Sequence, residues 1–181
     1  MPKETVVPSR TMITLGAVEG DLIVEKGSIV KGEGTPPKID VSGSVACNGN
    51  CKFECSLTAE EFEGEGDITV EGDIEVKDNV EISDGQLYVT GKMSAKDVEV
   101  DRSLIVDKDL KAEHVDVGGS LEVKGNVVAQ TIDVGGSFMG YGEVKVDSID
   151  VGGSVHIDSK VEAKSIDVGG KAVVKGGRIE E

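Results

Sequence analysis

The chain has 181 residues, enough for one domain with a continuous buried core, and its 3% aromatic content without tryptophan excludes a core of large rings. A formal net charge of −16, from 35 acidic and 19 basic residues, disfavours nucleic acid and anionic membrane surfaces as partners. No apolar run approaches the about 20 residues of a membrane span. The start, MPKETVVPSR, also lacks the apolar stretch of a signal peptide, so a cytoplasmic location is expected.

A repeat of 17 residues dominates the second half of the chain. The string S/T-I-D-V-G-G begins at Thr131, Ser148 and Ser165, and a close variant begins at His114. Apolar residues recur at repeat positions 2, 4, 8, 10, 14 and 16, which gives three short segments that each alternate with period 2. Such repeats predict an all-β fold, a single-stranded parallel β-helix (β-solenoid) with roughly triangular coils. Because left-handed solenoids use six-residue units and 17 is not a multiple of six, we expect a right-handed one.

In chain order, we expect a short disordered tail at residues 1–12, which contain Pro2 and Pro8, and a β-solenoid domain over 13–181. After a short stretch at 13–18, a first coil is expected at roughly 21–37. The next, 38–60, has about six extra residues, which we place around Cys51. Coils at 61–78 and 79–96 each have one extra residue, and five coils without a gap fill 97–181. The prediction is about nine coils.

Equivalent residues of successive coils should lie directly over one another. We expect Ile132, Ile149 and Ile166 in one vertical stack, and Leu22 and Val45 in the inward column that contains Ile68 and Leu87. Position 6 is glycine in most coils, and we interpret it as a corner that needs a positive φ. These glycines are Gly66, Gly85, Gly119, Gly136, Gly153 and Gly170.

Position 3 is acidic in eight consecutive coils, which predicts an outward ladder of like charge. Two interpretations stay open: a solvated face that keeps rods from associating side by side, and a weak cation-binding stripe. The calcium-binding nonapeptide repeat has a different period, which favours the first. The eight residues are Asp40, Glu63, Glu81, Glu99, Asp116, Asp133, Asp150 and Asp167.

Cys47, Cys51 and Cys55 form a C-x3-C-x3-C run, which differs from the C-x2-C pairs of structural zinc sites. Their odd number and close spacing argue against a secreted disulfide framework and fit a reducing compartment. We expect Cys47 in the inward column of Val24, Val70 and Val89, and the other two in the insertion. The three are weak candidates for a metal or redox site, and no cofactor is predicted.

No catalytic residue is predicted. His114 and His156 fall in different columns, so they cannot be neighbours in one stacked site, and a surface position is expected for both. Catalytic solenoids usually carry long loops over one face, whereas this repeat has a single insertion of more than a couple of residues. We therefore expect the protein not to be an enzyme.

The segments GDLIVEKGSIVKGE, GDITVEGDIEV and GSLEVKGNVVA resemble those of bactofilins, the polymer-forming cytoskeletal proteins of bacteria with relatives in archaea. The resemblance extends from about residue 16 to the end. It implies a right-handed triangular β-helix that polymerises through its ends without nucleotide or metal, and that serves as a scaffold in cell shape or protein positioning. Core residues of the terminal coils would then mediate self-assembly, and they are Leu22, Val24, Val168, Ala172 and Val174.

The leading hypothesis is a non-enzymatic cytoskeletal or scaffold protein whose partner is another copy of itself. Open strand edges at the two ends would allow head-to-tail contacts, giving a filament, or like-to-like contacts, giving a dimer or a nonpolar filament. The alternative is an accessory solenoid subunit that docks on an enzyme and holds a metal through its cysteines. An enzyme with its own site is the third hypothesis.

Overall fold

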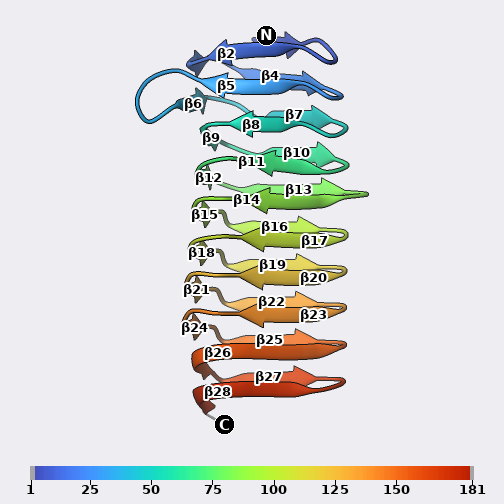
Figure 1. Ribbon diagram of the computed structural model, residues 1–181, viewed down its shortest axis with the longest axis vertical. Coiled ribbons are helices and arrows are strands. Elements are labelled where there is room, and N and C mark those ends of the chain that lie inside the picture. Colours follow the sequence, from blue (N-terminus) through green and yellow to red (C-terminus); the bar gives the residue numbers. More distant parts are fainter. Residues whose placement is uncertain (1–2, 180–181) are drawn as a thin grey trace.

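The computed structural model describes residues 3–179. In this range the chain forms 28 strands joined by turns, with no helix, and consecutive coils pair in parallel. The strands wind into a rod with the N-terminus at one end and the C-terminus at the other (Figure 1). The predicted single-stranded parallel β-solenoid is therefore confirmed. One sheet contains ten strands, one from each coil, so there are about ten coils and not nine.

The rod has three faces, to which successive strands contribute in turn. The first face consists of β1 (Glu4–Val7), β4 (Asp21–Glu25), β7 (Val45–Asn48), β10 (Phe62–Glu65), β13 (Asn79–Ser83), β16 (Asp97–Val100), β19 (His114–Val117), β22 (Thr131–Val134), β25 (Ser148–Val151) and β27 (Ser165–Val168). The second consists of β2 (Met12–Leu15), β5 (Ile29–Gly32), β8 (Lys52–Glu54), β11 (Ile68–Val70), β14 (Gln86–Val89), β17 (Ser103–Val106), β20 (Ser120–Val123), β23 (Ser137–Gly140), β26 (Ser154–Ala163) and β28 (Ala172–Ile179).

The third face is built from shorter strands and from the second halves of β26 and β28. The shorter strands are β3 (Ala17–Val18), β6 (Lys38–Val41), β9 (Ser56–Ala59), β12 (Ile74–Val76), β15 (Met93–Ser94), β18 (Leu110–Lys111), β21 (Val127–Val128) and β24 (Val144–Lys145).

The core is one continuous set of aliphatic columns inside the rod. Ile132 pairs with Ile149, and Ile149 with Ile166, so the predicted vertical stack is confirmed. Ile132 and Ile149 are buried and Ile166, in the last coil, is partly buried. Because each coil covers the one before it, most inward side chains lose their contact with water, and burial of this kind is the main stabilising contribution.

The N-terminal segment differs from the expectation. Glu4–Val7 is not a disordered tail but strand β1, which pairs with β4 so that Thr5 lies over Leu22 and Val7 over Val24. The strand forms because Thr5 and Val7 alternate inward with the same period as every later coil, and Pro8 lies just beyond the strand, where its missing N–H breaks no ladder bond. Residues 1–2 of the expected tail lie outside the described range.

The extra residues of the early coils also lie elsewhere than predicted. They form the exposed loop at 33–37 between β5 and β6, which projects from the upper left of the rod in Figure 1, and not a loop around Cys51. Val45 consequently stacks between Leu22 and Phe62, so these residues do not share a column with Ile68. The first-face and second-face strands on either side of a corner have the same alternation of inward and outward residues. The sequence alone therefore did not show to which of these two faces Val45 belongs.

The corner glycines are required for a different reason than the one predicted. Of the six, Gly66 alone has a positive φ, of 82°. A Cβ added at Gly136 would lie 2.4 Å from the carbonyl oxygen of Gly119, and one at Gly153 would lie 2.3 Å from that of Gly136. At the five corner glycines other than Gly66, the carbonyl of the preceding coil thus approaches so closely that no side chain fits there.

Candidate self-assembly site

At the C-terminal end of the described rod, inward columns lack the cover that they have elsewhere. β27 and β28 pair with β25 and β26 and, among the described residues, have no strand on their other side. Val174 is 37% exposed and Ala172 is exposed, although both occupy columns that are buried inside the rod. Val168 is partly buried. The three C-terminal candidates therefore lie together at one open edge.

The two N-terminal candidates do not lie at an end. Leu22 and Val24 belong to the second coil and are 0% exposed, because β1 covers them on one side and β7 on the other. The terminal edge is instead formed by β1, β2 and β3. Its partly covered inward side chains are Thr5, Ile13 and Leu15.

Sequence reasoning missed this N-terminal coil although a signal for it was present. Asp21 lies 17 residues after Glu4, so stepping back by one more repeat reaches the segment E-T-V-V, which alternates like the later first-face strands. The segment M-I-T-L, from Met12, has the second-face pattern and pairs with β5. A search for the repeat upstream of residue 21 would have found both.

The acidic ladder runs along the outside of the first face. It has seven members, because Asp40 pairs with Thr58 on the third face and does not belong to it. Among the described residues, no Lys or Arg forms an ion pair with any ladder carboxylate. Nor does that part of the chain contain a group of three acidic, His or Cys side chains placed to hold a metal ion. The ladder members are Glu63, Glu81, Glu99, Asp116, Asp133, Asp150 and Asp167.

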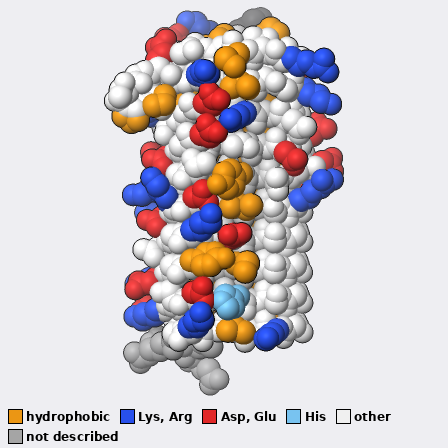
Figure 2. Space-filling view, in the orientation of Figure 1, with side chains coloured by type: hydrophobic (Ala, Val, Ile, Leu, Met, Phe, Trp, Pro, Cys, Tyr) orange, Lys and Arg blue, Asp and Glu red, His pale blue; other side chains and the backbone are white. Residues whose placement is uncertain are grey.

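Ion pairs gather instead on the second and third faces, and several of them connect successive coils. On the second face the Tyr88 hydroxyl donates a hydrogen bond of 2.5 Å to Asp107, and Lys124 lies 3.0 Å from the same carboxylate. These two contacts, the Tyr88 bond first, lower the pKa of Asp107 from its ordinary value of 3.8. The face seen in Figure 2 accordingly mixes apolar and charged side chains and contains no deep hollow.

The cysteines differ from the prediction. Cys47 and Cys51 form a disulfide with a Cα–Cα distance of 6.2 Å, which joins β7 to the start of the second face across one corner. Cys47 stacks between Val24 and Gly64 on the first face, not with Val70. The expectation that the cysteines stay reduced therefore does not hold for Cys47 and Cys51.

The third cysteine, Cys55, remains a thiol. It is fully buried, and burial raises the pKa of this thiol to about 12. A thiol with so high a pKa is neutral near pH 7 and is a poor nucleophile and metal ligand. With Cys47 and Cys51 joined to each other, the cysteine run as it stands offers no set of thiolates to a metal.

The two histidines lie on different faces. His114 is exposed on β19 and its Nδ1 lies 2.7 Å from the Thr131 hydroxyl of the next coil. His156 lies on β26, and its Nε2 is 2.8 Å from Asp158, which also binds Lys175. Each contact links side chains at the surface, and the two sites are not brought together.

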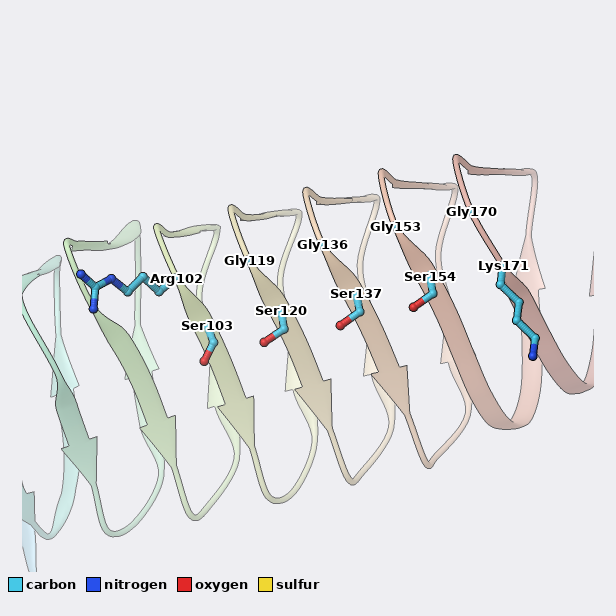
Figure 3. A pocket seen from close by; sticks show the side chains of 10 residues that line it. All are labelled: Arg102, Ser103, Gly119, Ser120, Gly136, Ser137, Gly153, Ser154, Gly170 and Lys171. Carbon is cyan, nitrogen blue, oxygen red and sulfur yellow. The ribbon is translucent and has the colours of Figure 1, made fainter.

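A shallow, open groove follows the corner between the first and second faces. Figure 3 shows that its serines come from equivalent places in successive coils, with Arg102 at one end and Lys171 at the other. The groove is shallow because glycines leave the corner without side chains, for the packing reason given above. In Figure 2 the same corner is largely white over the lower part of the rod. It is lined by Arg102, Ser103, Gly119, Ser120, Gly136, Ser137, Gly153, Ser154, Gly170 and Lys171.

The described residues include no helix that is long and apolar enough to cross a membrane. Comparisons of the chain with protein-family models, with curated proteins and with solved structures found no match.

Proposed function

We propose that this protein is a non-enzymatic scaffold protein of the bactofilin type, which assembles end to end with further copies of itself. The observation that carries the proposal is the open edge at the C-terminal end, where Ala172 and Val174 are exposed in columns that the rest of the rod keeps buried. Another coil placed on this edge would remove their side chains from water and pair the free backbone groups of β27 and β28.

The sides of the rod are less suited to such contacts. The first face has an unpaired ladder of carboxylates, which repels an identical face of another copy. The second and third faces carry ion pairs between coils, so association there would have to break or bury some of them. The bactofilin resemblance of the repeats supports the same mode of assembly.

The test is the size of the assembly in purified protein at several concentrations, by electron microscopy and light scattering. We expect rods longer than one chain, growing with concentration. Replacing Ala172 or Val174 with Arg places a charge in the contact and should give a folded protein with shorter assemblies. A matched control is Val128→Arg on β21, which adds the same charge at an outward side chain, 47% exposed, in the middle of the rod.

Assembly size unchanged by Ala172→Arg and Val174→Arg would show that the C-terminal edge is not the contact. A wild-type protein that remains a single chain at every concentration would contradict the proposed function altogether. Circular dichroism of each variant checks that the β-solenoid is still folded.

A further inference from the structure

We infer that Asn48 is a site of spontaneous deamidation, where the side-chain amide is lost and a carboxylate forms, and that the Cys47–Cys51 disulfide slows this reaction. The site lies on the corner between β7 and β8 in the third coil, a part of the rod that the proposed assembly does not use (Figure 1). The sequence, the hydrogen bonds and the disulfide at this corner lead to the inference, and the charges beside it give its consequence.

The sequence at this corner favours deamidation. Asparagine amides are among the thermolabile groups of proteins, and in the usual reaction the backbone nitrogen of the next residue attacks the side-chain carbon Cγ. A side chain on that next residue obstructs the attack. Asn48 is followed by Gly49, whereas the other three asparagines of the chain are followed by Cys51, Val80 and Val127. The two valines are β-branched and crowd their own nitrogen most.

The attacking nitrogen of Gly49 is also free of hydrogen bonds. In the described part of the chain its N–H donates to no backbone or side-chain acceptor. By contrast, Val127 N–H, which follows Asn126, donates a bond of 2.8 Å to the carbonyl of Glu143 in the next coil. Attack at Asn126 has to break this bond between coils, whereas attack at Asn48 breaks no such bond.

The side chain of Asn48 is exposed and can turn toward Gly49, because a long hydrogen bond of 3.3 Å from its Nδ2 to Glu25 is a weak restraint. In the reaction the Gly49 nitrogen loses its proton and bonds to Cγ, the Cγ–Nδ2 bond breaks, and ammonia departs, which leaves a cyclic imide. Water then opens the imide at one of its two carbonyls. The product is aspartate, or isoaspartate, in which the main chain passes through Cβ and Cγ of the residue.

The disulfide restrains the same corner. Cys47 and Cys51 flank the three residues that include Asn48 and Gly49, and their Cα atoms are 6.2 Å apart. Gly27 N–H, from the preceding coil, also donates a bond of 3.2 Å to the Gly49 carbonyl. Closing the imide requires rotation about the backbone bonds of Asn48, and a cross-link restricts such rotation in the loop that it closes. Reduction of the disulfide should therefore speed the reaction.

The charges beside Asn48 determine what deamidation does to the rod. Asn48 pairs with Glu25 of the preceding coil and with Glu65 of the following one, so its neutral amide separates two carboxylates. The product places three like charges on successive strands about 4.8 Å apart, an arrangement that is destabilising. Isoaspartate also adds a backbone carbon to the corner. Deamidation should therefore lower the stability of the third coil, and high salt should remove the part that is due to charge.

The test is to incubate the purified protein at neutral pH, with and without a phosphine, and to follow each asparagine by mass spectrometry of its peptides. Conversion of an amide to an acid raises the peptide mass, and chromatography separates aspartate from isoaspartate. We expect Asn48 to react at least about tenfold faster than Asn126, and faster again in the reduced protein. Asn48→Gln, whose longer side chain forms the imide poorly, is the control and should stay intact.

The variant Asn48→Asp tests the consequence, because it has the new charge on an unaltered backbone. It should melt roughly 2–8 °C below Asn48→Gln at low salt, and together with it in molar NaCl. Equal melting of the two variants at low salt would show that the added charge does not destabilise the coil.

Amide loss at Asn48 that is no faster than at Asn126 overturns the inference. Equal rates with and without the phosphine mean that the disulfide does not control the reaction, and that part of the inference is then wrong. Neither result bears on the proposed assembly, which is measured separately.

Discussion

Two glycine-to-alanine substitutions four residues apart should change stability in opposite directions. At Gly136 the added methyl group would lie 2.4 Å from the Gly119 carbonyl oxygen, where an ordinary contact begins at about 3.4 Å. The two coils must therefore separate locally by roughly 1 Å. Gly136 N–H donates a bond of 2.8 Å to that same oxygen, and the separation weakens it.

The expected loss combines about 1–3 kcal/mol for overpacking with about 1 kcal/mol for the weakened hydrogen bond. For a chain of this length each kcal/mol lowers the melting temperature by about 2–4 °C, so Gly136→Ala should melt roughly 5–15 °C below the wild type. Thermal unfolding followed by circular dichroism measures this difference.

Gly140→Ala is the matched control, with the same chemical change at a buried glycine. Its added methyl group would lie 3.4 Å from Val144 and 3.6 Å from Ile157, which are ordinary contacts, and its φ is not positive. Because alanine restricts the unfolded chain, we expect about 0.4–1 kcal/mol of added stability. The reasoning would be refuted if Gly136→Ala melted within 1 °C of the wild type or above Gly140→Ala.

The remaining predictions concern the disulfide and the carboxylates. Reduction with a phosphine, or Cys47→Ser, should lower the free energy of unfolding by about 2 kcal/mol, because a disulfide that closes so short a loop restricts the unfolded chain by about that much. As a control, Cys55→Ser should still lose stability when the reductant is added. Equal melting temperatures with and without reductant would contradict this prediction. Asp107→Asn should lower the melting temperature at pH 7. Asp133→Asn should raise the free energy of unfolding at low salt by up to about 1 kcal/mol. Because the pKa of Asp107 is lowered from 3.8, its contribution is present above pH 3.8 and disappears as the pH falls through the folded value, so its variant should then melt with the wild type. The effect at Asp133 should instead disappear in molar NaCl, and a gain that persists there would show that repulsion is not its source.

The repeated strings that begin at Thr131, Ser148 and Ser165 supply most of the evidence from which the fold was predicted. A constant spacing together with an inward and outward alternation leaves few folds other than a stack of parallel coils, and the vertical stack through Ile149 follows from it. Where the repeat lacks its D-V-G-G anchor, as around Val45, two successive strands have the same alternation. Which of the two strands lies on which face then depends on where the insertion lies, and the structure places it at the loop 33–37.

The candidate site was predictable in kind and only partly in position. That core residues at open ends would be involved follows from the solenoid itself, and Val174 lies at such an end. The sequence places Leu22 near an end because no complete coil is expected before 21–37 and residues 1–12, with Pro2 and Pro8, are expected to be disordered, whereas β1 covers Leu22. A proline next to a corner leaves the ladder intact, and composition alone cannot distinguish that position from one inside a strand.

The sequence by itself determined the class of fold, the length of the coil, and the separation of inward aliphatic from outward charged columns, because these depend on local alternation and spacing. Only the tertiary structure decided which residues are neighbours at the corners and where the repeat is irregular. It joined Cys47 to Cys51, removed Asp40 from the acidic ladder, and placed the Gly119 carbonyl against Gly136. These contacts depend on an insertion that shifts the register, on the path of the chain around a corner, and on the distance between two stacked coils, and the spacing of the repeat determines none of these.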